Sequence, residues 1–373
     1  MTKRKNSNIF SIFYFSSLAD RNFFERSFPF RHHAFTVRLL ASSAILVIAS
    51  ASPLAAQAGR AAAASEPKLW STPWDGRPRD PFADAKGKVW FVGQEGNYVG
   101  RLDPKSGDFK RYAVADGTHP HNLVVAANGM VWFTGNANGR IVRLDPATGK
   151  LTNFMMPDAS VRDPHTMTFD RKGDVWFTAQ GAAVVGKLTP ADGKIRLWRM
   201  ERGSRPYGIL VDSKDRPWFC LFGRNELGTI DPRTGELKTY TLPNDRARPR
   251  RLAITSDDAV WYGDYTRGFL GRLDPRSGKV DEWALPSGPM SLPYAVTSDD
   301  RGRIWLAETG PQPNRLVAFD PASKRFVETI TIAADRANTI RHMTFDPASR
   351  QIWFGGDANM IGRVRVAPAS LVP

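Results

Sequence analysis

Histidine, arginine and tyrosine side chains recur at one position of this sequence, eleven residues before each of seven regularly spaced tryptophans. These residues are Arg79, His121, His165, Tyr207, Arg250, Tyr294 and His342. Two residues earlier in each case lie Arg77, His119, Asp163, Arg205, Arg248, Leu292 and Ile340, so four of the six histidines fall in these two sets. Histidine exchanges protons near neutral pH, and arginine forms forked hydrogen bonds with carboxylates and phosphates. These residue types predict a site for acid–base chemistry or for binding an anion.

The tryptophans that define this spacing occur once in each of seven similar sequence units. They lie at positions 90, 132, 176, 218, 261, 305 and 353. Intervals of 42 to 48 residues are typical of propeller blades and of helical solenoids. The units lack a helical apolar stripe and are rich in Val, Ile, Thr, Phe and Trp between turn residues, which favours strands. The repeat therefore predicts an all-β protein, a seven-bladed β-propeller.

Each unit holds four predicted strands, as the second unit shows at 121–126, 130–134, 140–144 and 151–156. The turn before its fourth strand is Asp145-Pro146-Ala147-Thr148-Gly149, and the same pattern recurs at 103–107, 231–235 and 274–278. Proline fixes φ, aspartate accepts hydrogen bonds from nearby amides, and glycine tolerates a positive φ. We therefore expect four-stranded blades.

The ends of the repeat region predict how the ring closes. The seventh unit ends with its third strand at 362–366, and an unmatched outer-strand sequence lies at 68–73. We expect the N-terminal strand to complete the last blade, since this leaves no open sheet edge at the seam. The predicted propeller spans 68–366, with a linker at 59–67 and a C-terminal tail at 367–373.

Residues 1–58 are interpreted as a leader that contains a signal peptide. Arg38 precedes a short apolar run, and small residues before Ala56 and Ala58 suit cleavage by signal peptidase. A translation start near Val37 would give this signal an ordinary length. An uncleaved anchor is the alternative, although the run is short for a membrane span. We expect a periplasmic or secreted monomer without a stable membrane anchor.

The net charge limits the classes of binding partner, and the cysteine content limits the possible disulfides. The formal net charge is +15, and it falls to +10 without residues 1–58, which hold seven basic and two acidic residues. A basic protein favours anionic partners, and the absence of a basic recognition helix in the sequence pattern argues against nucleic acid. Cys220 is the only cysteine, so no intramolecular disulfide can form, and we expect it to be a core residue.

The loops that lead into the innermost strands of a propeller converge at one end of its axis. The seven repeated His, Arg and Tyr positions are therefore expected to form a ring there. The alternative is that these side chains only cap the channel and bind loop backbones. Three residues after the fifth and sixth tryptophans lie Asp264 and Glu308. We expect this pair to approach Arg250 and form an ion pair, with a metal site as the alternative.

The blade pattern as a whole resembles a known family. Over residues 68–366, units show the pattern Pro-His-x-[Leu/Met]-[Val/Thr] followed by [Val/Ile]-Trp-Phe-[Thr/Gly]. This pattern is similar to that of the virginiamycin B lyase (streptogramin lyase) family. The resemblance implies a carbon–oxygen lyase that opens a cyclic depsipeptide by elimination and uses Mg²⁺. On matching motif positions, His121 would contact substrate and His165 would be the acid/base. Asp163 stands at the first metal position and Ala179 at the second, so any Mg²⁺ is expected to be weakly held.

Three functions are compatible with these residues. The leading hypothesis is an exported lyase-like propeller that binds a small polar or anionic ligand, with His165 and His121 as catalytic residues. Its binding residues would be Arg79, His119, Tyr207, Arg205, Arg250, Tyr294 and His342. The second hypothesis is a non-catalytic binding or interaction propeller that uses the same face. The third is a metal-dependent lactonase, which needs more oxygen ligands on the axis than Asp163 alone provides.

Overall fold

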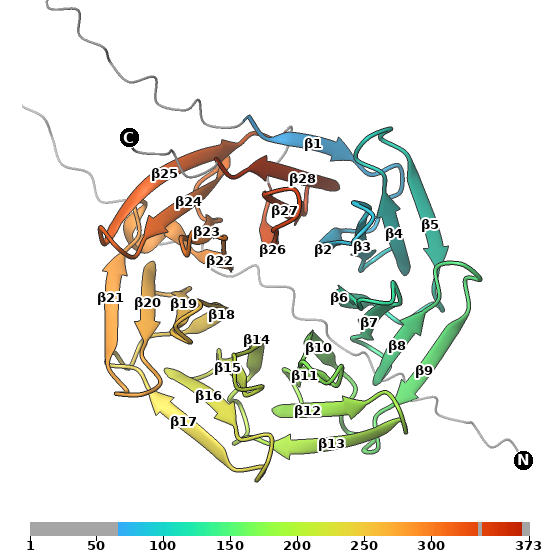
Figure 1. Cartoon of the computed structure of the whole chain (residues 1–373), viewed down its shortest axis with the longest axis horizontal. Helices are drawn as coiled ribbons and strands as arrows, with labels where there is room; N and C mark the ends of the chain where they lie inside the picture. Colours follow the sequence, from blue (N-terminus) through green and yellow to red (C-terminus); the bar gives the residue numbers. More distant parts are fainter. Residues whose placement is uncertain (1–65, 335–337, 368–373) are drawn as a thin grey trace, which may run out of the picture. The chain divides into compact units, whose positions relative to one another are not determined.

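The computed structural model describes residues 66–334 and 338–367, and these residues form seven four-stranded antiparallel sheets arranged in a ring (Figure 1). The predicted seven-bladed propeller is thus confirmed. The leader assigned to 1–58 and most of the linker and tail lie outside the described residues. In the described part of the chain, no helix is long and apolar enough to cross a membrane.

The innermost strand of each blade begins at the predicted ring and runs along the axis. These strands are β2 (Pro78–Ala83), β6 (Pro120–Val125), β10 (Pro164–Phe169), β14 (Pro206–Val211), β18 (Pro249–Ile254), β22 (Pro293–Ser298) and β26 (Ile340–Asp346). The second strands carry the repeated tryptophans. They are β3 (Val89–Gly93), β7 (Val131–Gly135), β11 (Val175–Ala179), β15 (Pro217–Leu221), β19 (Val260–Asp264), β23 (Ile304–Glu308) and β27 (Gln351–Gly356).

The third and fourth strands complete each blade toward its outer edge. The third strands are β4 (Tyr98–Leu102), β8 (Arg140–Leu144), β12 (Val184–Thr189), β16 (Glu226–Ile230), β20 (Phe269–Leu273), β24 (Asn314–Asp320) and β28 (Met360–Arg365). The outer strands are β5 (Phe109–Ala113), β9 (Leu151–Met155), β13 (Lys194–Arg199), β17 (Leu237–Thr241), β21 (Val280–Ala284) and β25 (Arg325–Ile332), with β1 (Lys68–Ser71) in the last blade. A short 3-10 turn, η1 (Gly288–Ser291), precedes β22.

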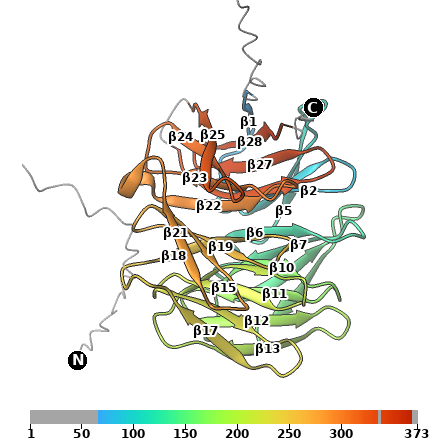
Figure 2. The same ribbon diagram turned by 60° about the vertical axis from the view of Figure 1, so that its left-hand side comes forward.

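Closure of the ring follows the predicted arrangement. Strand β1 pairs with β28, so that Lys68 lies opposite Arg363, and Figure 2 shows the two strands side by side. The Trp70 ring stacks on the ring of Trp353 at a centroid distance of 5.6 Å. The first and last parts of the propeller therefore share one sheet, which leaves no unpaired seam.

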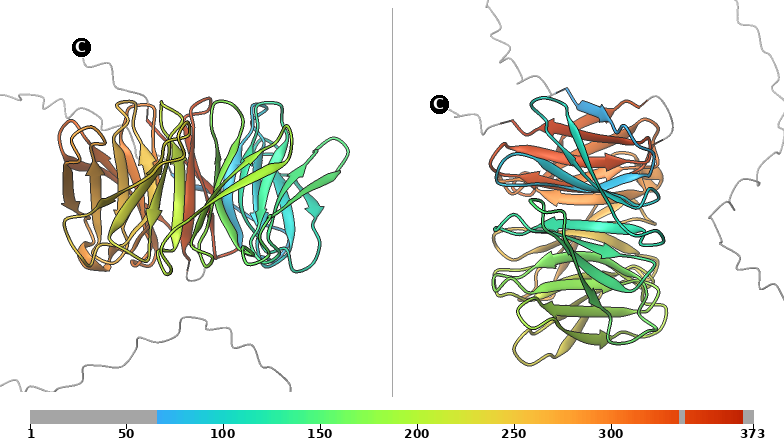
Figure 3. Two further views of the ribbon diagram at one scale, coloured as in Figure 1. Left: turned by 90° about the horizontal axis from the view of Figure 1, so that it is seen from below. Right: turned by 90° about the vertical axis from the view of Figure 1, so that its right-hand side faces the viewer.

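The core lies between neighbouring blades. In each blade, the second strand is buried along its whole length, because both of its faces meet another sheet. One cluster, for example, joins Trp90 of β3 to Val131 and Phe133 of β7. The edge views in Figure 3 show the sheets side by side around the axis, with loops at both faces of the ring. Cys220 is buried in β15, as expected for a core residue.

The turn between the first and second strands is fixed by an aspartate in four blades. Asp212 accepts hydrogen bonds from the amides of Lys214 and Arg216 and from the indole Nε1 of Trp218, the last at 2.9 Å. Equivalent indole contacts join Asp84 to Trp90, Asp170 to Trp176 and Asp299 to Trp305. The tryptophan therefore both fills the core and, through its indole N–H, anchors the turn.

A bulge interrupts the opposite end of every inner strand, next to the ring. In β18, for example, Pro249 lies opposite Asp264 and Leu252 opposite Tyr262, so the inner strand holds one extra residue. The same shift occurs in the six other blades. A bulge changes the direction of the side chains beside it. Four blades thereby bring two consecutive polar side chains to the end of the channel, namely Arg79 and Asp80, His121 and Asn122, His165 and Thr166, and Arg250 and Arg251.

Candidate functional site

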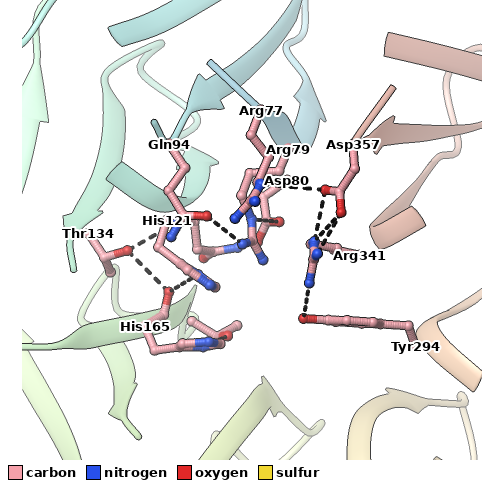
Figure 4. Close-up of polar contacts among 12 residues, drawn as sticks. Arg77, Arg79, Asp80, Gln94, His121, Thr134, His165, Tyr294, Arg341 and Asp357 are labelled. Carbon is pink, nitrogen blue, oxygen red and sulfur yellow. Dashed lines mark hydrogen bonds and ion pairs between the residues drawn. The ribbon is translucent and has the colours of Figure 1, made fainter. Parts of the chain in front are cut away.

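The axial site has a pair of closely packed histidines on one side, whose rings are tilted against each other by 39°. The rings of His121 (β6) and His165 (β10) lie 3.7 Å apart between centroids, and the His165 ring lies 4.2 Å from that of Tyr207. The His121 Nδ1 atom donates to the backbone carbonyl of His165 at 3.1 Å, which leaves its Nε2 as the acceptor nitrogen. The His165 Nδ1 atom contacts the Thr166 hydroxyl at 2.9 Å. Figure 4 shows both imidazoles pointing toward the axis.

Both histidines are held in their neutral form. Burial lowers the pKa of His121 and of His165 well below the ordinary value, and the positive charges of Arg79 and Arg251 lower it further. Each ring is only 4% exposed. A neutral imidazole can accept a proton, and it can bind an anion only as a hydrogen-bond donor. The pair is therefore suited to acid–base work more than to holding a negative charge.

Tyrosines and arginines form the other side of the site. The hydroxyl groups of Tyr207 (β14) and Tyr294 (β22) lie 2.5 Å apart. The guanidinium of Arg250 (β18) lies over the Tyr294 ring, 3.5 Å from its centroid, and donates to the Tyr207 hydroxyl at 3.3 Å. Arg341 (β26) donates to the Tyr294 hydroxyl at 3.4 Å and forms a forked ion pair with Asp357 (Figure 4).

A buried carboxylate lies at the centre of the ring. Asp80 is fully buried, and it contacts Arg79 Nε at 3.1 Å and Arg251 Nη2 at 3.4 Å. The Asn122 side chain donates to it at 2.7 Å. Burial alone would raise the pKa of this carboxyl, but Arg79, His342 and Arg251 outweigh that effect and lower the pKa below its usual range. Asp80 is therefore a fixed negative charge that holds two guanidinium groups in place.

The structure brings most of the predicted ring together. Contacts join Arg250, Tyr207 and Tyr294 on one side and link His121 through His165 to Tyr207 on the other. The side chains meet one another across the axis. A cavity of about 230 Å³ extends along the inner strands from this level, and its lining includes Asn122, Thr166, Arg251 and His342.

The members of the second predicted set lie on the loops above this ring, except Ile340, which begins β26. The His119 amide binds the side chain of Asn97 at 2.9 Å, and the Arg205 guanidinium lies 5.3 Å from the Phe222 ring centroid. Asp163 accepts hydrogen bonds from the backbone amides of Gly181 and Ala182. Asp163 is thus held by backbone amides, whereas the His165 imidazole contacts the Thr166 hydroxyl.

The expected ion pair of Arg250 with Asp264 or Glu308 is wrong. Asp264 contacts Arg267 at 3.2 Å and accepts from the Arg248 amide at 2.9 Å. Glu308 accepts from the backbone and hydroxyl groups of Ser287 and from the Ser291 hydroxyl. Both carboxylates end a second strand, where the amides of the adjoining loops lack sheet partners, and these amides and hydroxyls bind them in place.

The residues at the implied metal position do not fit Mg²⁺. Asp163 already binds two backbone amides, and Ala179, at the second position, has no side-chain oxygen. Within 66–334 and 338–367, no three His, Cys, Asp or Glu side chains are grouped so that they could hold a metal ion. Mg²⁺ prefers several oxygen ligands in octahedral geometry, which this donor set does not provide.

The sequence reasoning missed three residues of the axial site, namely Asp80, Arg251 and Arg341. The first two each follow a predicted ring residue, and the third precedes one. A regular strand would have turned them away from the axis. The bulge in each inner strand turns them toward it. Consecutive polar residues just after the loop proline, such as Arg79-Asp80 and Arg250-Arg251, were the available signal.

The chain is similar to several solved propellers. Virginiamycin B lyase from Staphylococcus aureus is 26% identical, with a TM-score of 0.73, over 81% of this chain and 100% of that one. A catalytically inactive histidine-to-alanine variant of the same lyase, solved with quinupristin, matches with the same identity, coverage and TM-score. The WD40 propeller domain of Doa1 is 14% identical, with a TM-score of 0.65, over 83% of this chain and 99% of that one, which shows a shared fold.

The comparison of sequences extends across the blades. The pattern that defines the virginiamycin B lyase family matches residues 81–364, which is most of the chain. A search of curated protein sequences gave no match. Together with the seven-bladed ring, the family match confirms the resemblance seen in the sequence. The chain belongs to the virginiamycin B lyase family.

Proposed function

We propose that this protein is an exported propeller that binds a small anionic ligand at the axial ring and acts on it as a carbon–oxygen lyase. The observation that carries the proposal is the state of Arg250. Its guanidinium lies among the Tyr207, Phe222, Tyr265 and Tyr294 rings, and no carboxylate in the described residues pairs with it. A partly exposed cation without a counter-charge favours an anionic ligand, which arginine can bind in a forked geometry.

Elimination needs a base for a carbon-bound proton and a positive charge near the group that activates it. Burial lowers the pKa of His165, so its imidazole is neutral at neutral pH and has a free nitrogen that can accept a proton. His121, whose ring packs against that of His165, would orient the substrate. The guanidinium of Arg250 would stabilise the negative charge that develops on a carbonyl or carboxylate oxygen. No step of this proposal passes through Mg²⁺.

A non-catalytic binding protein is the second candidate. The observation that favours it is the close packing of the ring side chains, since His121, His165, Tyr207 and Tyr294 are each no more than 4% exposed. A ligand would then rest on the partly exposed Arg250 and on the loops above, without reaching the imidazoles. Periplasmic or extracellular location and a monomeric state belong to both versions of the proposal.

The test is a titration of the purified propeller with inorganic phosphate and with succinate, in the wild type and in Arg250→Ala and His165→Ala. Loss of a charged hydrogen bond costs about 1.5 to 3 kcal/mol, so Arg250→Ala should weaken binding by roughly 10- to 100-fold. Added salt should also weaken binding, because partly exposed ionic contacts are screened. His165→Ala should weaken binding less and should abolish any release of an unsaturated product.

The matched control is Arg233→Ala, which removes an exposed arginine of an outer turn. It should leave affinity and melting temperature unchanged. If the Arg250→Ala, His165→Ala double variant keeps wild-type affinity, or if it does not fold, the ring is structural and the proposal is wrong. The wild type should also be incubated with a metabolite mixture that raises its melting temperature. If the variants lose anion binding but the wild type releases no product from this mixture, the protein is a non-catalytic binding protein and not a lyase.

A further inference from the structure

Tyr294 lies in an environment that favours a negative charge on its oxygen. Its hydroxyl meets that of Tyr207 at 2.5 Å and the Arg341 guanidinium at 3.4 Å. Arg250 covers its ring, and Arg79 lies close enough to act on its charge. The remaining neighbour, Tyr265, presents its ring at 6.0 Å between centroids. Hydrogen-bond donors and cations around a hydroxyl both favour the ionised form.

The charges on the axis are unbalanced while Tyr294 is neutral. Four guanidinium groups gather there, those of Arg79, Arg250, Arg251 and Arg341. Two carboxylates face them, Asp80 with Arg79 and Arg251, and Asp357 with Arg341. Arg250 has no carboxylate partner in the described residues. A buried or half-buried cation without a counter-charge is costly, so an anion next to Arg250 would be stabilised.

We propose that Tyr294 is an ionised phenolate at neutral pH, that it serves as the counter-charge of Arg250, and that it is a proton acceptor of the axial site. Tyr207 remains protonated and donates its hydroxyl hydrogen to the Tyr294 oxygen. The inference rests on the proposed function only for the last of these roles.

The titration behaviour of the two phenols agrees with this division. Burial would raise the pKa of Tyr294, but Arg250, Arg79 and Arg341, helped by the Tyr207 hydroxyl, lower it to about 7. Burial and the charge of Tyr294 both raise the pKa of Tyr207. One proton is therefore shared within the pair at pH values where two ordinary tyrosines would hold two.

A phenolate here could accept the proton that an elimination removes, in place of the more weakly basic imidazole of His165. The substrate would carry that proton on the carbon next to a carboxylate or ester carbonyl, and an oxygen leaving group on the following carbon. The proton would pass to the Tyr294 oxygen, the C–H electron pair would form the C=C bond, and the leaving oxygen would depart with the electrons of the C–O bond. The reaction needs no oxidant, reductant or second substrate.

The test is an ultraviolet titration of the phenolate absorbance in the folded wild type and in single tyrosine variants. We expect one transition near neutral pH, well below the ordinary tyrosine range. Tyr294→Phe should remove it. Tyr207→Phe should move it to higher pH, because the phenolate loses a donor. Tyr265→Phe is the matched control, since that ring also contacts Arg250 without a hydrogen bond to Tyr294, and it should leave the transition in place.

Inorganic phosphate or acetate provides a second measurement that does not depend on the Tyr294 substitution. An anion bound at Arg250 competes with the phenolate for positive charge, so saturating anion should move the transition to higher pH. A wild type without a near-neutral transition would overturn the inference, and so would a transition that persists in a folded Tyr294→Phe variant. These results are separate from the proposed function. If anion binding depends on Arg250 while no phenolate forms, the function stands and the role of Tyr294 falls.

Discussion

The two ends of the inner hairpin in each blade are built differently. At the turn end, Asp84, Asp170, Asp212 and Asp299 make the same contact to the tryptophan of their own blade, at 2.8 to 3.1 Å. At the ring end, the corresponding positions hold arginine, histidine or tyrosine, and each makes different contacts. The turn contact is local, and it repeats in four blades because it needs only residues of its own hairpin. The ring contacts join different blades and depend on all of them.

The difference separates stability from function. A contact that recurs in several blades serves the fold that the blades share. A position that varies from blade to blade while remaining polar and buried has no such common role, and buried polar side chains are costly unless they are paired. The ring end is therefore where we place the site. Variants at the two ends should have opposite effects on stability and on binding.

The largest expected effect comes from breaking the scaffold at its seam. A chain that begins at Gly76 lacks β1, its pairing with β28 and the Trp70–Trp353 stacking. We expect its melting temperature to fall by about 10 °C or more, since an exposed strand edge and a lost aromatic contact each destabilise the blade. A chain that begins at Glu66 keeps β1 and is the control. Equal melting temperatures for the two chains would contradict the role of β1 in closure.

The second prediction compares one residue from each end. Asp212→Ala removes the acceptor of two amides and of the Trp218 indole N–H, which leaves buried donors unpaired. It should reduce the free energy of unfolding by about 2 to 4 kcal/mol and leave anion affinity unchanged. Arg250→Ala should weaken anion binding and leave the free energy of unfolding unchanged. Asp192→Ala, in an exposed outer turn, controls for loss of charge. Calorimetry and anion titration on all three variants would show whether the two ends are separable.

The third prediction concerns acid stability. Burial lowers the pKa of His121 and His165, and lowers that of His342 to about 3. In the unfolded chain these imidazoles bind protons below about pH 6.5, whereas in the folded protein they do not. Their contribution is therefore complete above that pH and decreases as the pH falls, by up to about 1.4 kcal/mol per pH unit for each histidine.

Melting temperatures between pH 5 and pH 7.5 would measure this slope. His165→Asn should reduce it, because one proton-binding difference between the two states is removed. A stability that is constant over this range would mean that the ring histidines are accessible to protons in the folded protein, and the neutral pair would then be excluded.

The smallest effect is expected at Asp163. Its carboxylate accepts from the Gly181 and Ala182 amides, so Asp163→Ala should cost about 1 kcal/mol. The loss should be the same in magnesium chloride and in EDTA, because the contact is to backbone. Asp163→Asn keeps one acceptor and should cost less. Stabilisation of the wild type by magnesium that disappears in Asp163→Ala would instead make this loop a cation site.

Much of the molecule could be predicted from sequence because it depends on local patterns. The spacing of Trp90 and its six counterparts indicated seven blades, and the unmatched strand at 68–73 indicated how they close. The position of the ring followed from the same spacing, since one residue per blade at a fixed distance from the tryptophan must lie at one height on the axis. These features repeat, and repetition is visible in a single sequence.

The partners of the ring residues were decided by tertiary structure. Arg250 was expected to meet Asp264, but it lies against Tyr294, whose hydroxyl in turn meets Tyr207 from a blade two positions away. Asp80 and Arg251 reach the axis only because each inner strand holds one extra residue at its bulge. A bulge is not marked by a distinctive residue type, so it could not be recognised in the sequence. Contacts across the axis join positions up to 171 residues apart in the chain, so no local pattern indicates them. Side chains from separate blades compete there for the same space and the same charges, so the result depends on the closed ring as a whole.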